Sequence, residues 1–91
     1  MVSFEILIEI HPTKRTEFLQ AFEMIESDGS HANERLEIGL FEQANCANTF
    51  LWKEHWENHE LLQQYFKSIS FRMMVGAINI LGRLVHKKVC N

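Results

Sequence analysis

Alternating apolar and polar positions predict four strands in this chain. From Val2 to Ile10 the sequence reads VSFEILIEI, in which every second residue from Phe4 onward is apolar and most residues between are polar. The clearest alternation follows Thr49, in the run TFLWKEHWE. Two further runs, 35–43 and 83–90, alternate in the same way. Only a short connection separates the 35–43 run from the run after Thr49, so these two strands are expected to form a hairpin.

Apolar residues at helical spacing predict three helices. The first is expected over residues 13–26, with Thr13 as its N-cap. The second begins after Asn58, whose side-chain oxygen can accept from a free backbone N–H in the first turn. The third covers residues 70–81 and is apolar nearly all round, which indicates burial on more than one side. Gly82 fits a C-terminal cap for this helix.

The resulting order β-α-β-β-α-α-β predicts a single α+β domain over residues 1–91. Four antiparallel strands with helices on one face form the ferredoxin-like, split β-α-β layout. The opposite face of the sheet is expected to be apolar and to need a cover, which a second copy of the chain supplies in a symmetric homodimer. The residues expected on that open face are Leu7, Leu36, Ile38, Leu40 and Leu51.

Composition narrows the classes of function. The formal net charge of −3 argues against a nucleic-acid partner, because such domains carry a basic face. No apolar run approaches the roughly 20 residues that cross a bilayer, and the N-terminus lacks the pattern of a secretory signal, so a cytoplasmic location without membrane contact is expected. Cys46 and Cys90 lack the spacing of a redox or zinc site and are expected to be reduced thiols.

The strand after Thr49 carries the strongest candidate chemistry. Trp52, Glu54 and Trp56 fall on its covered face, where they form either a bulky core or the wall of a pocket. A carboxylate beneath tryptophans is partly desolvated, which raises its pKa and suits it to proton transfer. Alternatively, Glu54 pairs with Arg72 or Arg83 or lies at an open end of the sheet. Arg72 is the one strong cation on an otherwise apolar helix.

The histidines do not predict a metal site. His55 and His59 have the i, i+4 spacing of helical ligands, but the junction of strand and helix falls between them. The glutamate that the zinc protease motif places directly after its first histidine is missing here. His11, His31 and His86 lie in or beside loops and short strands with no carboxylate partner visible in the sequence. All five are therefore interpreted as surface residues.

Two short segments resemble a known family. The run Glu54-His55-Trp56-Glu57-Asn58 is similar to the Glu-x-Trp-x-Ser segment of the antibiotic biosynthesis monooxygenase domains, with asparagine in place of the serine cap. The run Ser68-Ile69-Ser70-Phe71 is similar to the Ser-Pro-x-Phe break of the same domains. The resemblance extends over nearly the whole chain and implies the dimeric α+β barrel fold.

The resemblance also implies several chemistries, because its members include cofactor-free oxygenases and haem-degrading proteins. In the haem-degrading branch a tryptophan, matched by Trp56, works with an asparagine and a histidine. Ile6 stands at about the asparagine position, and the run Phe71–Val75 has no histidine, so haem degradation is a third and weaker interpretation. A histidine common in the family falls at about Tyr65, and the asparagine of the cofactor-free branch falls at Trp52.

The function expected first is a homodimeric monooxygenase that acts on a small aromatic or quinol-like molecule without a metal or other cofactor. Glu54 or Tyr65 would move the proton, Trp56 would position the ring, and Arg72 would stabilise the anion. Residues expected to line the substrate cleft are Phe4, Ile6, Trp52, Phe66, Met74 and Ile78. The alternative is a non-catalytic dimeric module that binds a hydrophobic ligand or has a structural role. An open cavity at Glu54 would favour the enzyme, and sealed tryptophans would favour the module.

Overall fold

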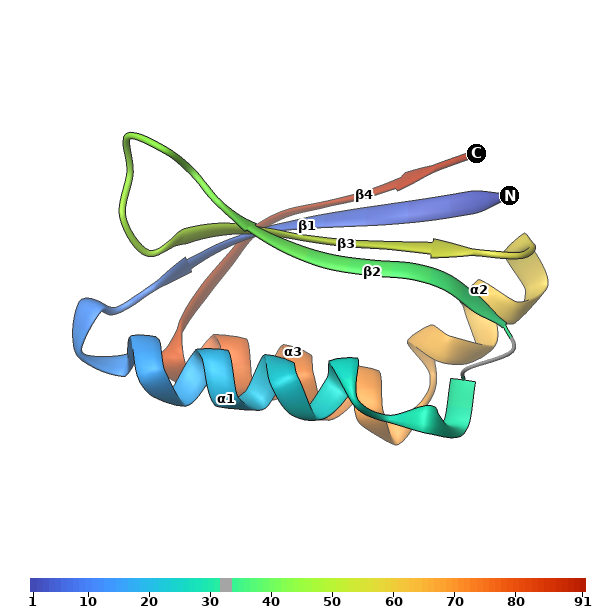
Figure 1. The fold of residues 1–91 in the computed structure, drawn as a ribbon, viewed down its shortest axis with the longest axis horizontal. Helices are drawn as coiled ribbons and strands as arrows, with labels where there is room; N and C mark the ends of the chain where they lie inside the picture. Colours follow the sequence, from blue (N-terminus) through green and yellow to red (C-terminus); the bar gives the residue numbers. More distant parts are fainter. Residues whose placement is uncertain (32–33) are drawn as a thin grey trace.

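The computed structural model describes residues 1–31 and 34–91 and folds as one sheet with helices on one side (Figure 1). Four antiparallel strands lie in the order β2-β3-β1-β4. The strands are β1 (Val2–Ile10), β2 (Arg35–Glu42), β3 (Thr49–Trp56) and β4 (Gly82–Cys90). The helices are α1 (Arg15–Glu26), α2 (His59–Phe66) and α3 (Ile69–Leu81), with short 3-10 turns at Pro12–Lys14 and Gly29–His31. This arrangement confirms the predicted α+β, ferredoxin-like fold and the hairpin of β2 and β3.

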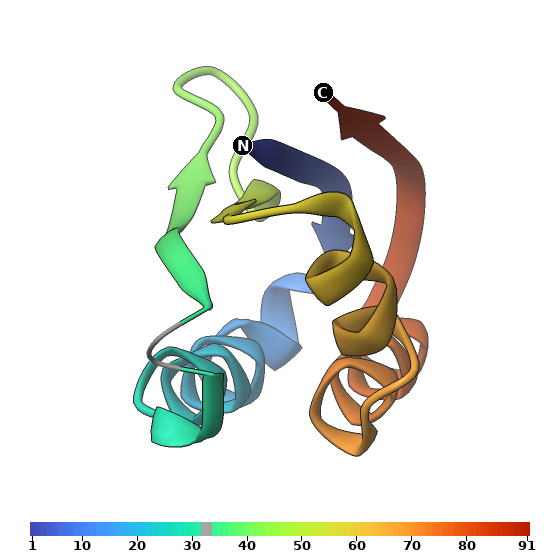
Figure 2. The same cartoon turned by 90° about the vertical axis from the view of Figure 1, so that its right-hand side faces the viewer.

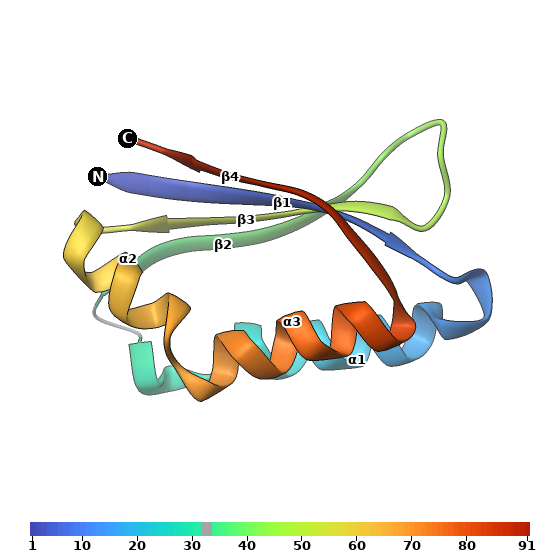
Figure 3. The ribbon, with the colours of Figure 1, turned by 180° about the vertical axis from the view of Figure 1, so that it is seen from behind.

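The molecule has two layers, and the core lies between them. Seen end-on, α1 and α3 lie side by side beneath the sheet (Figure 2). The short α2 covers the other end of the same face, near both termini (Figure 3). Along β1 every second residue from Val2 to Ile10 is buried, which is the period of a strand with one covered face. The predicted apolar face of this strand is therefore the face under the helices.

The covered face of β2 differs from the prediction. Ile38 lies opposite Glu54 and Leu40 lies opposite Trp52, so both side chains face the helices and pack against the core. The prediction that they line the open face is wrong. The alternation in β2 defines two faces but does not determine which one meets the helices, and a register shift between Arg35 and Glu37 interrupts the strand at Leu36.

The open face of the sheet is consequently less apolar than predicted. Leu7 and Leu51 lie opposite each other on it, as predicted, and Phe41 lies beside Leu51. Phe41 is 57% exposed. Charged and polar residues surround these three, namely Glu5, Glu37, Lys53, His55, His86 and Lys88.

Side-chain caps set the starts of the two later helices. Asn58 Oδ1 accepts from the Leu61 amide at 2.9 Å, which confirms the predicted N-cap of α2. Ser68 Oγ accepts from the Phe71 amide at 3.2 Å and caps α3 in the same way. The predicted cap at Thr13 is wrong, because Thr13 lies within a 3-10 turn and the residue that precedes α1, Lys14, makes no side-chain cap.

Gly82 is the C-cap of α3, as predicted, and its amide donates to the Ile78 carbonyl, but glycine is required there for a different reason. Its backbone is extended, with φ −178°, and it begins β4 directly after α3. A Cβ atom built on it would lie 2.0 Å from the Glu9 carbonyl oxygen. Glycine therefore permits the close approach of β4 to the end of β1, and no left-handed cap is involved.

The edge strand β4 carries a second irregularity. The register between β1 and β4 shifts between Leu7 and Ile8, so that Leu84 lies opposite Ile8 while Lys87 lies opposite Ile6. Both side chains face the helices, although strict alternation predicts opposite faces for them. The Lys87 ammonium group lies 3.8 Å from the centre of the Phe66 ring. Within the described residues, none of the helices is long and apolar enough to cross a membrane.

Candidate active site

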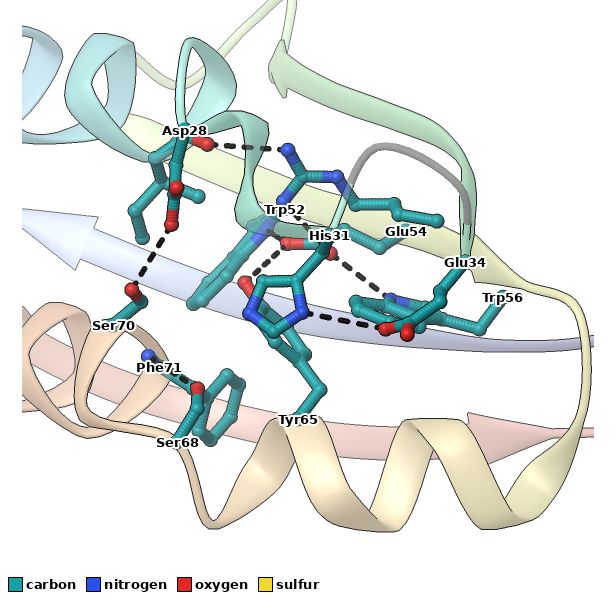
Figure 4. A network of polar contacts seen from close by, with 12 residues as sticks. Asp28, His31, Glu34, Trp52, Glu54, Trp56, Tyr65, Ser68, Ser70 and Phe71 are labelled. Carbon is teal, nitrogen blue, oxygen red and sulfur yellow. Dashed lines mark hydrogen bonds and ion pairs between the residues drawn. The ribbon is translucent and has the colours of Figure 1, made fainter.

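Glu54 is a fully buried carboxylate at the centre of the covered face. It lies on β3 between Trp52 and Trp56, and its neighbours across the sheet are Phe4 and Ile38. The relative exposure of Glu54 and of both tryptophans is 0%. Because a strand directs residues i and i+2 to the same side, both indoles flank the carboxylate on the helix side (Figure 4).

Three buried donors bind the Glu54 carboxylate. Trp52 Nε1 donates to Oε2 at 2.8 Å, and Trp56 Nε1 donates to Oε1 at 3.1 Å. The Tyr65 hydroxyl, from α2, donates to Oε2 at 3.0 Å. Each carboxylate oxygen therefore has at least one hydrogen-bond donor, as a buried charge requires.

The cation that pairs with Glu54 is Arg35. Its Nη1 lies 3.5 Å from Glu54 Oε1, and its side chain is only 7% exposed. A second guanidinium nitrogen, Nη2, donates to the carbonyl of Ile25 at 3.2 Å. Arg35 therefore connects the start of β2 to the buried carboxylate of β3 and to the end of α1.

The predicted partners of Glu54 were wrong. Arg72 is exposed on α3, and Arg83 donates to Glu9 Oε1 at 2.6 Å on the sheet surface. Sequence reasoning missed Arg35 because it opens β2 at the end of a polar stretch. The hairpin register is the signal that identifies it, since Arg35 lies opposite Trp56.

The pKa of Glu54 is raised above its usual value of 4.5. Burial is the largest cause, while the charge of Arg35 and the three hydrogen bonds act in the opposite direction. The pKa of Tyr65 is also raised, mainly by burial and then by the nearby Glu54 carboxylate. The site thus combines a carboxylate that holds its proton more strongly than usual with a hydroxyl that stays neutral.

Aromatic rings enclose this polar group. The Tyr65 ring lies 4.5 Å from Trp56, and the Phe71 ring lies 5.5 Å from Trp52, between centroids. Phe4 contacts both Trp52 and Tyr65. Of the predicted cleft residues, Phe4, Ile6, Trp52, Met74 and Ile78 are buried in one core, and Phe66 is half-buried at its margin.

A surface hollow lies away from Glu54. It has a volume of about 540 Å³ and lies between α1 and α3. Its lining includes Ala21, Met24, Met73, Met74 and Ala77, with the Ser70–Asp28 hydrogen bond at one end. Met74 is the only residue that it shares with the predicted cleft.

His31 is a site residue that sequence reasoning assigned to the surface. Its ring lies 5.5 Å from the Trp56 ring and 5.2 Å from the Tyr65 ring, between centroids. Its Nδ1 is 3.6 Å from a carboxylate oxygen of Glu34. Figure 4 shows the imidazole between Glu34 and Tyr65. No local motif marks this histidine, and only the tertiary packing brings it to the site.

The described residues offer no metal site. Within residues 1–31 and 34–91, no group of three or more histidine, cysteine, aspartate or glutamate side chains could hold an ion. His59 is exposed on α2, where its Nε2 lies 3.4 Å from Gln63 Nε2. Cys46 and Cys90 are free thiols.

Comparison with known proteins supports the fold. No family profile and no curated protein matches the sequence. Among solved structures, Rv0793 from Mycobacterium tuberculosis superposes with a TM-score of 0.84 at 14% identity, covering 99% of this chain and 92% of that one. SnoaB, a cofactor-independent oxygenase from Streptomyces nogalater, gives 0.83 at 14% identity over 99% and 90%. A protein described as an antibiotic biosynthesis monooxygenase gives 0.80 at 19% identity over 98% and 93%. The chain therefore has the fold of the antibiotic biosynthesis monooxygenases.

Proposed function

We propose that this protein is a cofactor-independent monooxygenase that acts on a small aromatic or quinol-like molecule at Glu54. The observation that carries the proposal is a fully buried carboxylate, with a raised pKa, held between two indoles and a tyrosine hydroxyl. Groups with this combination of burial and charged partners concentrate at catalytic sites. The shared fold with SnoaB, a cofactor-independent oxygenase, supports the same reaction class.

The chemistry follows from proton transfer to Glu54. The carboxylate takes a proton from an activated ring carbon or hydroxyl group of the substrate, and the resulting anion gives one electron to dioxygen. The two radicals combine into a C–O–O bond. Protonation of the outer oxygen and loss of water then leave a carbonyl group, so that a CH₂ group and O₂ become C=O and H₂O. Such a reaction needs no metal or flavin, and the apolar surroundings protect the anion from water.

Each step of this reaction is assigned to particular residues. We assign proton transfer to Glu54 and Tyr65, and orientation of the ring to Trp56 by offset stacking. Arg35 replaces the exposed Arg72 as the cation that stabilises the anion, since Arg35 lies within 3.5 Å of Glu54. The substrate would enter beside His31, which is partly exposed and contacts both Trp56 and Tyr65.

We further propose that the chain forms a homodimer through the open face of the sheet, in the cytoplasm. Leu7, Leu51 and the exposed Phe41 form an apolar centre on this face, and charged residues surround it. An apolar centre with a polar rim is the usual anatomy of a protein interface. The free thiols of Cys46 and Cys90 agree with a reducing compartment.

A second candidate function is a non-catalytic module that binds a hydrophobic ligand. Two observations favour it. Both tryptophans have 0% exposure, and the hollow between α1 and α3 has a volume within the range of small-molecule sites, about 300–1,000 Å³. In that case Glu54 and its donors have a structural role, and the ligand contacts Met24 and Met73.

Oxygen uptake tests the two candidates against each other. The purified protein is mixed with a panel of quinols and anthrone-like phenols while dissolved oxygen and tryptophan fluorescence are recorded together. The monooxygenase predicts oxygen consumption that is lost in Glu54→Gln and kept in Glu57→Gln, a matched change at an exposed glutamate three residues away. Ligand binding without oxygen consumption, abolished by Met73→Glu and unaffected by Glu54→Gln, would support the module instead.

A further inference from the structure

The buried Glu54 carboxylate is in contact with a small set of polar groups. Its partners are Trp52, Trp56, Tyr65 and Arg35. The indole N–H groups and the guanidinium group donate hydrogen bonds but do not accept them, so they pass no proton onward. The hydroxyl of Tyr65 both donates and accepts. Among these partners, Tyr65 is therefore the only group that can relay a proton.

The surroundings of Tyr65 lead toward solvent at His31. Exposure rises stepwise from Glu54 at 0% and Tyr65 at 1% to the side chains of His31 at 20% and Glu34 at 43%. The His31 ring lies 5.2 Å from the Tyr65 ring, and its Nδ1 lies 3.6 Å from the Glu34 carboxylate. Imidazole accepts a proton on one nitrogen while it releases another, near neutral pH.

We propose that His31 is the positioning residue that exchanges protons between the Glu54–Tyr65 pair and solvent, with Glu34 as its outer partner. As the proton of Glu54 passes to the Tyr65 oxygen, the hydroxyl proton passes to Nε2 of His31, directly or through one water. The imidazole then releases a proton on its other side, beside Glu34. In total the Glu54–Tyr65 pair loses one proton to solvent, and the Tyr65 oxygen again carries one proton. For turnover the inference rests on the proposed oxygenase function: the outer oxygen takes its proton from solvent, so Glu54 returns to solvent, once in each cycle, the proton that it has taken from the substrate.

The charges that face this path come from the start of β2 and the residue just before it. Arg35, on β2, faces Glu54, and Glu34, just before β2, faces His31. From α2 and β3 the path meets only the neutral side chains of Tyr65 and Trp56. Among the described residues, the contacts of His31 include the carboxylate of Glu34, which is more exposed than His31, and this favours release of the proton outward.

The fluorescence of the tryptophans allows a test that needs no substrate. The two tryptophans both donate to Glu54, so the protonation of Glu54 changes the surroundings of every indole in the protein. A stopped-flow pH jump followed by tryptophan fluorescence measures the rate of this proton exchange. In weakly buffered solution His31→Asn should relax at least about tenfold more slowly, and added free imidazole should restore the native rate.

Matched variants distinguish a loss of proton transfer at His31 from a loss of packing around it. His59→Asn, at an exposed histidine of α2, should relax at the native rate. His31→Gln, which keeps a hydrogen-bonding side chain that does not titrate, should be as slow as His31→Asn, and near-ultraviolet circular dichroism checks that both fold. Native rates in both His31 variants would overturn the proposal, as would a slow rate that imidazole leaves unchanged.

Oxygen uptake distinguishes this inference from the proposed function. If the protein is the oxygenase, His31→Asn should lower kcat about tenfold in weak buffer with KM unchanged, and imidazole should restore it. If no substrate is oxidised but the pH-jump result holds, the proton path stands and the oxygenase proposal fails. Full activity in His31→Asn without imidazole, in the same weak buffer, would overturn the path while leaving the oxygenase intact.

Discussion

Two of the arginine–glutamate pairs in the molecule differ in almost every physical respect. Arg15 binds Glu42 at the surface through two short contacts, of 2.6 and 2.8 Å. Arg35 approaches Glu54 in the core through one contact of 3.5 Å. The surface pair lowers the pKa of Glu42 to about 2, mainly through the hydrogen bond from Arg15. In the core, burial outweighs the arginine and raises the pKa of Glu54.

This difference teaches that an ion pair does not by itself determine how a carboxylate behaves. A bidentate surface pair keeps its solvation and holds the carboxylate ionised, which suits a structural contact. The core pair is removed from water and is held by a longer contact. Its carboxylate is therefore close to accepting a proton. Only the second arrangement has the properties of a proton-transfer site.

Removal of the buried cation should have the largest effect. Arg35→Met leaves Glu54 buried without a charge partner and is expected to lower the free energy of unfolding by about 3 kcal/mol. Urea unfolding followed by circular dichroism measures this free energy. Arg15→Met, the matched change at the surface pair, should cost much less. Equal losses in the two variants would mean that the two pairs contribute alike and that the comparison fails.

Removal of the tyrosine donor should have the next largest effect. Tyr65→Phe takes one of the three hydrogen bonds from Glu54 and should lower the free energy of unfolding by about 1–3 kcal/mol. A double-mutant cycle with Glu54→Gln isolates the coupling, because the two residues are in direct contact. A coupling energy indistinguishable from zero would contradict the hydrogen bond as a stabilising contact.

The pH dependence of stability should differ in sign between the two pairs. Because the folded pKa of Glu54 exceeds its usual 4.5, the folded state binds the extra proton in the interval between these values. Its contribution to stability is therefore present below about 4.5 and is lost as the pH rises through the folded pKa. Urea unfolding from about pH 4 to about pH 8 should show a smaller decline in Glu54→Gln than in the native chain. An identical decline in Glu54→Gln and in the native chain would mean that other groups cause it.

Glu42 should give the opposite and smallest effect. Its pKa of about 2 lies below the usual 4.5, so its contribution is present above 4.5 and is lost as the pH falls toward 2. Glu42→Gln should therefore lower the melting temperature at neutral pH and remove part of its decline between about pH 4.5 and about pH 2. Glu57→Gln, at an exposed glutamate, is the control. An acid decline as steep in Glu42→Gln as in the native chain would contradict this assignment.

The sequence predicts the layers of this fold well because strand and helix periods are local signals. The alternation in β1 and β3 identifies their covered faces, and Asn58 identifies a helix start from one side chain. The same local signals fail at irregular positions. Neither register shift, near Arg35 in β2 or between Leu84 and His86 in β4, leaves a trace in the alternation, and the close approach at Gly82 depends on a distant carbonyl.

The candidate site is predictable only in part, for the same reason. Trp52, Glu54 and Trp56 share one strand, so their common face follows from spacing alone. Their partners come from other elements and depend on tertiary packing. Arg35 reaches Glu54 across the hairpin, and His31 reaches Tyr65 from a 3-10 turn. Charge and residue type alone predict Arg72 as the cation of the site, but Arg72 is exposed.

The two register shifts also bear on how this protein avoids uncontrolled association. The strands at the margins of the sheet, β2 and β4, are the strands at which pairing is irregular. On β4, the basic residues Arg83, His86, Lys87 and Lys88 follow one another closely. Bulged and charged margins are poor templates for the backbone of another chain. Continuous strand addition, the route to fibrils, is thereby disfavoured, while the open face of the sheet stays available for specific contacts.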